Sequence, residues 1–170
     1  MKTAAAMIGV CGVLAFAAGR VGAMEALQTL PLSGALHATY RPANCPKGTP
    51  AMTDGSVTPC YLAIAHGTIR GLGTVTDRRV AVLLHSTTKC MQVKQSVVLT
   101  VATRGTIGAN AATQRCVDPQ ADVKIVPFRI TGGTSAFAGA TGSGTITIST
   151  AGAGYGFETE TWKGRLTLPR

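Results

Sequence analysis

Apolar and polar side chains alternate along most of this chain, and that period of two residues is the feature that most constrains its fold. Two clear examples are Val97, Leu99 and Val101, and Val126, Phe128 and Ile130. Successive side chains of a β-strand point to opposite faces, so each run turns one face toward a core and the other toward water. The 3.6-residue period of a helix is missing beyond the first 23 residues. The sequence therefore predicts an almost entirely β protein.

Runs rich in Val, Ile and Thr, separated by glycines and turn-forming residues, predict about eight strands. They cover residues 33–40, 61–70, 73–76, 80–86, 96–104, 106–114, 123–131, 144–150 and 155–168, and we expect 73–86 to form one bent strand. Glycines inside these runs, such as Gly67 and Gly156, are typical of bends that let a sheet curl. Eight curling antiparallel strands favour a single closed β-barrel, which has no exposed edges. A β-sandwich is the alternative that strand spacing leaves open.

The last run changes the face that carries its apolar side chains. Phe157 falls on one face, whereas Trp162 and Leu166 fall on the other. We expect a β-bulge in the intervening residues, because one extra residue would restore a single apolar face. Glu158 and Glu160 lie in this stretch, two residues apart. We interpret them as solvated partners of neighbouring Lys and Arg side chains rather than as an acid–base pair or a cation site.

The first 23 residues have the pattern of an export signal. Lys2 supplies a positive start, residues 4–18 are apolar and uncharged, and Ala23 ends a small-residue cleavage site. Cleavage there would leave residues 24–170 as one domain, and cleavage near residue 17 or 18 is the alternative. The apolar stretch is shorter than the roughly 20 residues that span a bilayer as a helix. We therefore expect a secreted or cell-envelope protein with no stable membrane anchor.

Four cysteines follow the expected leader: Cys45, Cys60, Cys90 and Cys116. An even number fits disulfides formed in an oxidising compartment, although four cysteines allow three pairings. We favour two disulfides, Cys45–Cys60 and Cys90–Cys116, because each pair brackets a polar or turn-like stretch. A zinc site is the rival interpretation, but the sequence has no C-x-x-C pair and its histidines are scattered. We expect neither a metal nor a cofactor.

The chain is strongly basic, with 16 Lys and Arg against 7 Asp and Glu. Two of the basic residues belong to the leader, so the mature chain would carry a net charge of +7. The basic residues are spread along the sequence, Arg78 and Arg79 form the only adjacent pair, and no aromatic–basic motif occurs, so we do not expect nucleic-acid binding. A positive surface attracted to an anionic envelope component is the interpretation we favour.

Residues 128–146 read FRITGGTSAFAGATGSGTI. This segment resembles the F-x-I-x-GGTG-x-FAGA-x-GSG-T signature of secreted bacterial proteins related to the allene oxide cyclase and dirigent barrel folds. The segments GTIRGLG at 67–73 and WKGRL at 162–166 are similar to the family as well. The resemblance spans about residues 33–168 and implies an eight-stranded antiparallel barrel of calycin-like shape.

The glycine-rich segment makes sense as a structural device. Its glycines permit a turn and close backbone approach, and Phe137 is expected to plug an apolar pocket. A phosphate-binding loop is the alternative, but the lysine of that motif is missing and no helix follows. In enzymes of the resembled families, polar and acidic groups lining the barrel do the work. Because the strand at 33–40 has no carboxylate, we assign no catalytic residue.

His37, His66 and His85 fall in predicted strands, and together with Tyr40 they are candidates for lining an interior pocket. Their spacing matches no known metal site. We expect a non-catalytic barrel that binds a small apolar ligand or an anionic envelope component. An isomerase or cyclase with its active site in the barrel cavity is the alternative. A roomy cavity that holds two or more inward ionisable groups with perturbed pKa values would favour the enzyme, whereas a barrel packed with side chains would favour a structural or interaction role.

Overall fold

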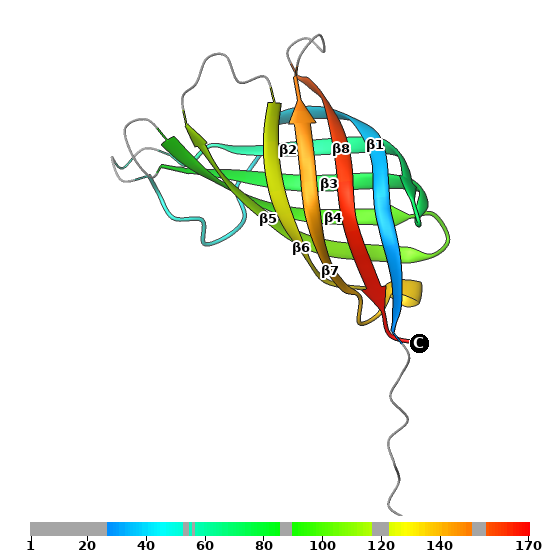
Figure 1. The fold of residues 1–170 in the computed structure, drawn as a ribbon. Helices are drawn as coiled ribbons and strands as arrows, with labels where there is room; N and C mark the ends of the chain where they lie inside the picture. Colours follow the sequence, from blue (N-terminus) through cyan, green and yellow to red (C-terminus); the bar gives the residue numbers. More distant parts are fainter. Residues whose placement is uncertain (1–26, 53–54, 56, 86–89, 117–122, 151–155) are drawn as a thin grey trace, which may run out of the picture.

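The computed structural model describes residues 27–52, 55, 57–85, 90–116, 123–150 and 156–170, so the expected export signal lies outside the described residues. Eight antiparallel strands form a closed barrel in which each strand pairs with the next and the last pairs with the first (Figure 1). They are β1 (Gln28–Pro42), β2 (Cys60–Arg70), β3 (Gly73–His85), β4 (Cys90–Val101), β5 (Gly105–Cys116), β6 (Val123–Gly133), β7 (Thr141–Ser149) and β8 (Phe157–Leu168). The predicted barrel is confirmed, and residues 73–85 form the single strand that we expected.

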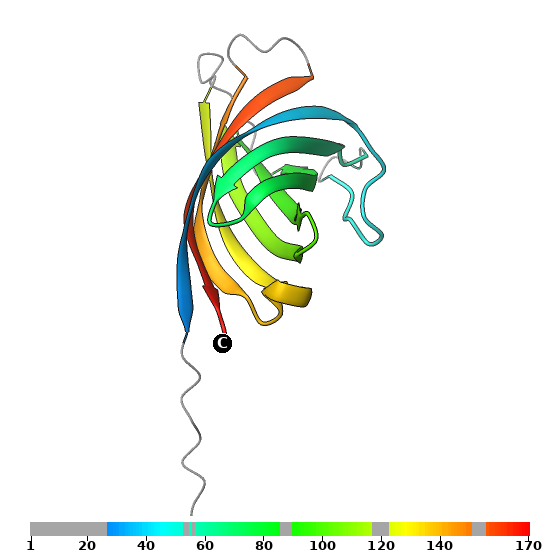
Figure 2. The same cartoon turned by 90° about the vertical axis from the view of Figure 1, so that its right-hand side faces the viewer.

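The two ends of the barrel differ. At one end, which we call the turn end, short connections follow β2, β4 and β6, and the last of these carries the 3-10 helix η1 (Ser135–Phe137). At the opposite mouth end, β1, β3, β5 and β7 finish. Figure 2 shows the strands wrapping around one interior, with the connection between β1 and β2 projecting from it in cyan. Within the described ranges, no helix is long and apolar enough to cross a membrane.

Phe137 closes the turn end. Its side chain is fully buried, and the guanidinium carbon of Arg104 lies 5.1 Å from the centre of its ring. Arg104 also donates a hydrogen bond from Nη1 to the carbonyl oxygen of Leu72, at 3.3 Å, and so ties two turns together across the end of the barrel. The predicted role of Phe137 as an apolar plug is confirmed.

Glycines let an aromatic pair fill the interior next to this plug. Gly144 and Gly164 lie directly opposite each other on β7 and β8, and a Cβ atom at either would lie within 3.1 Å of Cζ of Phe128. The Phe128 ring occupies this space and packs against Trp162, with ring centroids 5.0 Å apart. The glycines therefore serve close packing, as the sequence indicated.

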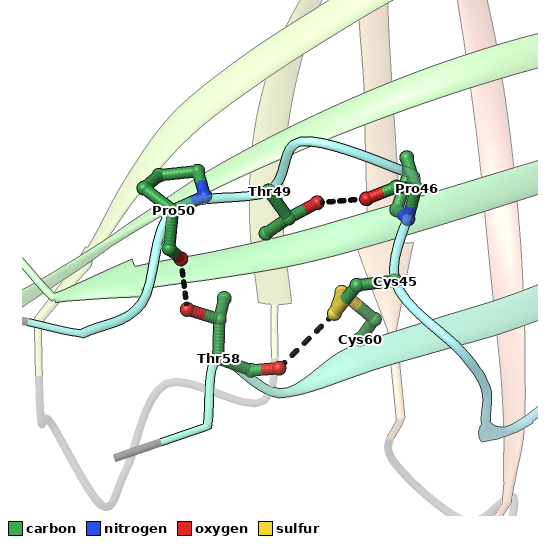
Figure 3. The surroundings of a disulfide bond; sticks show 6 residues. All are labelled: Cys45, Pro46, Thr49, Pro50, Thr58 and Cys60. Carbon is green, nitrogen blue, oxygen red and sulfur yellow. Dashed lines mark hydrogen bonds between the residues drawn. A yellow bond between two sulfur atoms is a disulfide. The ribbon is translucent and has the colours of Figure 1, made fainter. Parts of the chain in front are cut away.

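Cys45 and Cys60 form a disulfide that anchors the long connection between β1 and β2 (Figure 3). Within this connection, the Thr49 hydroxyl donates a hydrogen bond to the Pro46 carbonyl, and the buried Thr58 hydroxyl donates one to Pro50, at 2.7 and 2.6 Å. This half of the predicted disulfide pattern is confirmed. The side chains of Cys90 and Cys116 lie outside the described residues, so their bond stays a prediction.

The predicted bulge in the last strand is wrong. The pairing of β8 with β1 runs without interruption from Phe157 to Leu168. Phe157 therefore points outward and is 52% exposed, whereas Glu158 and Glu160 point inward with Trp162. Our interpretation of the two glutamates as solvated is wrong for the same reason, because an unbroken register keeps them on the inner face.

Candidate functional site

Four ionisable side chains meet inside the barrel. Asp77 and Arg79 project inward from β3, and Glu158 and Glu160 project inward from β8. Asp77, Arg79 and Glu160 are at most 1% exposed as whole residues, and the Glu158 side chain is 12% exposed. We call these four residues the acidic cluster.

Small residues on the intervening strands make room for the acidic cluster. In the register of the sheet, Ala38 of β1 and Ala65 of β2 lie between Glu158 and Asp77. Both alanines are buried and point inward. The long side chain of Arg79 can therefore cross the interior from β3 and reach the carboxylates of β8.

Arg79 is the centre of the cluster. Its Nη2 lies 3.5 Å from Oδ2 of Asp77 and 3.4 Å from Oε1 of Glu158, and it also pairs with Oε1 of Glu160. Its Nη1 donates a hydrogen bond to Oε1 of Gln95, at 3.4 Å. One guanidinium thus contacts three carboxylates, and the cluster holds an excess of negative charge when all three are ionised.

The three carboxylates have different surroundings. The Trp162 indole donates a hydrogen bond to Oε2 of Glu160, at 3.0 Å, and this side chain is held from both sides. Neither oxygen of Asp77 accepts a hydrogen bond among the described residues. Burial raises the pKa of Asp77 to about 6, the positive charge of Arg79 opposes this rise, and the charge of Glu158 adds to it. Asp77 can therefore exchange a proton near neutral pH.

Several inward residues between the cluster and the mouth end are less buried than the core on the turn side. Core residues on the turn side, such as Trp162, are fully buried, whereas the inward residues Tyr40, Tyr61, Ala81 and Gln95 are only half-buried. The two tyrosines meet edge to face, with ring centroids 6.4 Å apart. The acidic cluster thus lies between an apolar core and a partly exposed inner wall that carries aromatic and amide groups.

The structure separates the residues that we expected to line a pocket. Tyr40 lies on the inner wall, but His37 and His66 are exposed on the outer face, where they lie opposite each other on β1 and β2. His66 Nδ1 and Thr76 Oγ1 are hydrogen-bonded at 3.2 Å. The side chain of His85 lies outside the described residues. The histidines face outward because their positions alternate with those of the buried Leu36 and Ala65.

Sequence reasoning missed Asp77 and Arg79, although a signal was present. Both residues are in phase with the buried Val75, just as Glu158 and Glu160 are in phase with Trp162. Charged residues that keep the phase of an apolar face indicate an interior polar site. Within the described ranges, no group of three or more His, Cys, Asp or Glu residues could hold a metal ion.

A shallow pocket lies elsewhere, on the outside of the barrel at the mouth end. It is lined by Arg41, Pro42, Ala43, Asn44 and Leu62. Arg41 is the only ionisable side chain in this lining. The acidic cluster therefore remains the stronger candidate for chemistry.

Solved structures share this fold. The pterocarpan synthase dirigent protein GePTS1 matches with a TM-score of 0.59 and 11% identity, over 87% of this chain and 94% of its own. The pterocarpan synthase dirigent protein PsPTS1 matches with a TM-score of 0.55 and 13% identity, over 86% and 97%. No protein-family model and no curated protein matches the sequence. At these identities the likeness shows the fold alone, and it agrees with the dirigent-like barrel that the sequence predicted.

Proposed function

We propose that this barrel binds a small organic molecule in the mouth-side half of its interior and moves a proton on it, as an isomerase, cyclase or lyase does. The observation that carries this proposal is the acidic cluster, three carboxylates around one guanidinium in a water-poor interior. Such a concentration of buried charge is expensive for a fold and is typical of functional sites. This choice reverses our preference from the sequence, which was a non-catalytic barrel.

Proton transfer on a substrate needs one group that gives a proton and another that takes one. Pairs of carboxylates in different environments divide these roles in many enzymes. Within the described residues, Asp77 accepts no hydrogen bond at either oxygen, and its pKa is raised, so it suits the acid. Glu158 contacts Arg79 and is partly exposed on the mouth side, so it suits the base that a ligand meets first.

Arg79 and Glu160 would act as positioning residues. Arg79 holds Glu158 and Gln95 at the border of the exposed inner wall, and Glu160 is fixed by Trp162 from the turn side. The half-buried rings of Tyr40 and Tyr61 offer a surface for an apolar or aromatic ligand.

A non-catalytic binding protein is the second candidate. The surroundings of Glu160 favour this candidate. Glu160 is fully buried, and its two oxygens contact Trp162 and Arg79, as they would in a purely structural ion pair. In that case the cluster would only set the preference for a ligand, and an apolar ligand with a hydrogen-bond donor would fit it best.

A proton-exchange assay distinguishes the two candidates. The full chain is incubated in D2O with aryl ketones as probes, and exchange of the hydrogen next to the carbonyl is followed by NMR. We expect the wild-type protein to accelerate exchange and D77N and E158Q to lose the acceleration, whereas H37A on the outer face keeps it. Probe binding without exchange would support the non-catalytic candidate, and neither binding nor exchange would contradict both.

We also propose that the protein works outside the cytoplasm as a disulfide-bonded domain. The Cys45–Cys60 disulfide supports an oxidising compartment, and the leader-like residues 1–23 are compatible with export. Amino-terminal sequencing of the protein recovered from its native compartment tests this proposal, and we expect a new terminus near residue 24.

A further inference from the structure

Charge is segregated between the two faces of the barrel wall. The side-chain carboxylates of the described residues, Asp77, Glu158 and Glu160, all point inward. The exposed side chains include ten cations: Arg41, Lys47, Arg70, Arg78, Lys94, Arg104, Arg129, Lys163, Arg165 and Arg170. Arg79 is the cation with which these inward carboxylates pair. Within the described ranges, the outer face therefore carries these cations and no acidic side chain.

Four of these cations form a regular pattern on neighbouring strands. Arg129 of β6, Ser143 of β7 and Arg165 of β8 lie side by side in the sheet register. A second row follows beside it. Lys163 of β8, Ser33 of β1 and Arg70 of β2 also lie side by side.

All six side chains are exposed, and the rows join on β8, where Lys163 and Arg165 are two residues apart. Each of these two cationic rows thus places a serine hydroxyl between two cations. The strands that carry most of them, β6, β7, β8 and β1, lie next to one another on one wall of the barrel (Figure 1).

The spacing of the two cationic rows sets the distance between the anionic groups that a ligand must carry. Neighbouring strands are about 4.8 Å apart and residues rise about 3.3 Å along a strand, so Ser143 and Ser33 lie about 12 Å apart. A single anionic group can accept hydrogen bonds from one serine and its two flanking cations. A polymer that reaches both serines therefore carries anionic groups roughly 12 Å apart.

A nucleic acid carries more charge over this distance, with one phosphate per about 3.4 Å along the axis of each strand, so the spacing of the rows does not select it. The rows also lack aromatic side chains, on which the bases of a single strand stack. An anionic membrane fits poorly as well. Peripheral binding to bilayers uses apolar side chains that insert below the headgroups, and neither row contains one.

We infer that the two cationic rows bind an acidic polysaccharide that carries a carboxylate or sulfate on alternate sugars. Arg and Lys supply the charge, Ser33 and Ser143 supply hydroxyls that donate to the anion or bond to sugar hydroxyls, and the rigid sheet holds the spacing fixed. This site lies on the outer face, away from the acidic cluster, so it does not depend on the proposed activity.

Hyaluronan oligosaccharides are a suitable probe, because they carry one carboxylate on every second sugar and no sulfate. Binding to the full chain is measured by affinity electrophoresis at low and at moderate ionic strength. We expect K163Q/R165Q, which removes a cation from each row, to weaken binding about tenfold or more. The matched control R78Q/K94Q removes the same charge from β3 and β4, and it is expected to bind nearly as the wild type does.

Two further comparisons make the inference falsifiable. S33A/S143A keeps every charge, and we expect it to bind several-fold more weakly because each cationic row loses its serine hydroxyl. Equal losses in the two charge variants, or unchanged binding in S33A/S143A, would overturn the site in favour of diffuse attraction. Tighter binding to oligo-dT or to phosphatidylglycerol vesicles than to hyaluronan would overturn the choice of polysaccharide. Circular dichroism of each variant confirms that the barrel is intact.

Discussion

Arg79 is the single residue that makes the acidic interior tolerable, because its guanidinium contacts Asp77, Glu158 and Glu160 together. We predict that R79M lowers the free energy of unfolding by about 3–5 kcal/mol at neutral pH, since it leaves buried carboxylates without a cation. Urea denaturation measures the change. The control R79K keeps a positive charge and is expected to lose less. An R79M protein as stable as the wild type would show that the carboxylates are not paired in solution.

Asp77 is expected to make the free energy of unfolding depend on pH. Its pKa is about 6 in the folded chain and 3.8 without the fold. Between these values the folded chain holds a proton that the unfolded chain releases, so the free energy of unfolding falls as pH rises through this window, by up to about 3 kcal/mol. Above pH 6 that loss is complete, and the folded chain carries a buried charge.

We predict that D77N removes this dependence. The variant should be more stable than the wild type at pH 7.5, and the advantage should shrink toward pH 4, where Asp77 is protonated in the folded chain. Urea denaturation at four values from pH 4 to 7.5 measures it, with H66A as a surface control. A D77N protein that is less stable at pH 7.5 would contradict the raised pKa. Gain of stability with loss of activity is the usual behaviour of functional residues.

At the scale of single residues, the sequence predicted the roles of some positions and not of others. It identified Phe137 and the glycines of 139–144, because their spacing reflects packing that is local in the chain. It did not identify Arg79 as the centre of a cluster: the phase of Arg79 with Val75 indicates an inward side chain, but nothing in residues 73–85 shows that β8 contributes carboxylates across the barrel. A cluster built from strands about 80 residues apart is visible only once the sheet has closed.

At the scale of elements, the contact between β7 and β8 depends on two opposed glycines. A Cβ at Gly164 would lie 2.5 Å from the carbonyl oxygen of Ser143 and 2.9 Å from Cα of Gly144. We predict that G164A lowers the free energy of unfolding by about 1–3 kcal/mol, because backbone must move to relieve the overpacking. Thermal unfolding followed by circular dichroism measures it. S143A on the outer face is the control, and equal stability of both variants would contradict the close packing.

The strands themselves were largely predictable, because alternation alone marks which residues face the core. Their ends were less so: β1 begins at Gln28 rather than near residue 33, since pairing with β8 continues to the end of that strand. The predicted bulge failed because apolarity was taken as the marker of the inner face. In β8 two of the inward side chains are carboxylates, so the polar character of a residue does not show there which face it lies on.

At the scale of the whole molecule, closure of the sheet gives the protein an inner and an outer surface, and in the described ranges the acidic side chains point inward while most cations point outward. Every pair of neighbouring strands is antiparallel, and in every pair but β1 and β8 the two strands also follow each other in the sequence. The hairpins therefore form locally, and one long-range pairing closes the barrel. The alternating sequence therefore predicts the architecture. It does not predict the sign of the charge on each face, because that depends on which phase of each strand turns inward.

Two disulfides would hold this closed molecule at its mouth end. The Cys45–Cys60 bond joins the connection after β1 to the start of β2. Cys90 and Cys116 are directly opposite each other in the register of β4 and β5, also at the mouth end. Opposed residues of antiparallel strands have Cα atoms about 4.5–5.5 Å apart, a separation that a disulfide can bridge.

We predict that mass mapping of non-reduced peptides links Cys90 to Cys116 as well as Cys45 to Cys60, with no free thiol in the mature chain. In the chain-entropy model each bond contributes about 3 kcal/mol, so C90A/C116A should lower the free energy of unfolding by about that amount. C45A/C60A is the comparison, because its bond closes a shorter loop, with a sequence separation of 15 residues, and should contribute slightly less. A peptide joining Cys60 to Cys90 would contradict the pairing, because it would link β2 to β4 across the intervening strand β3.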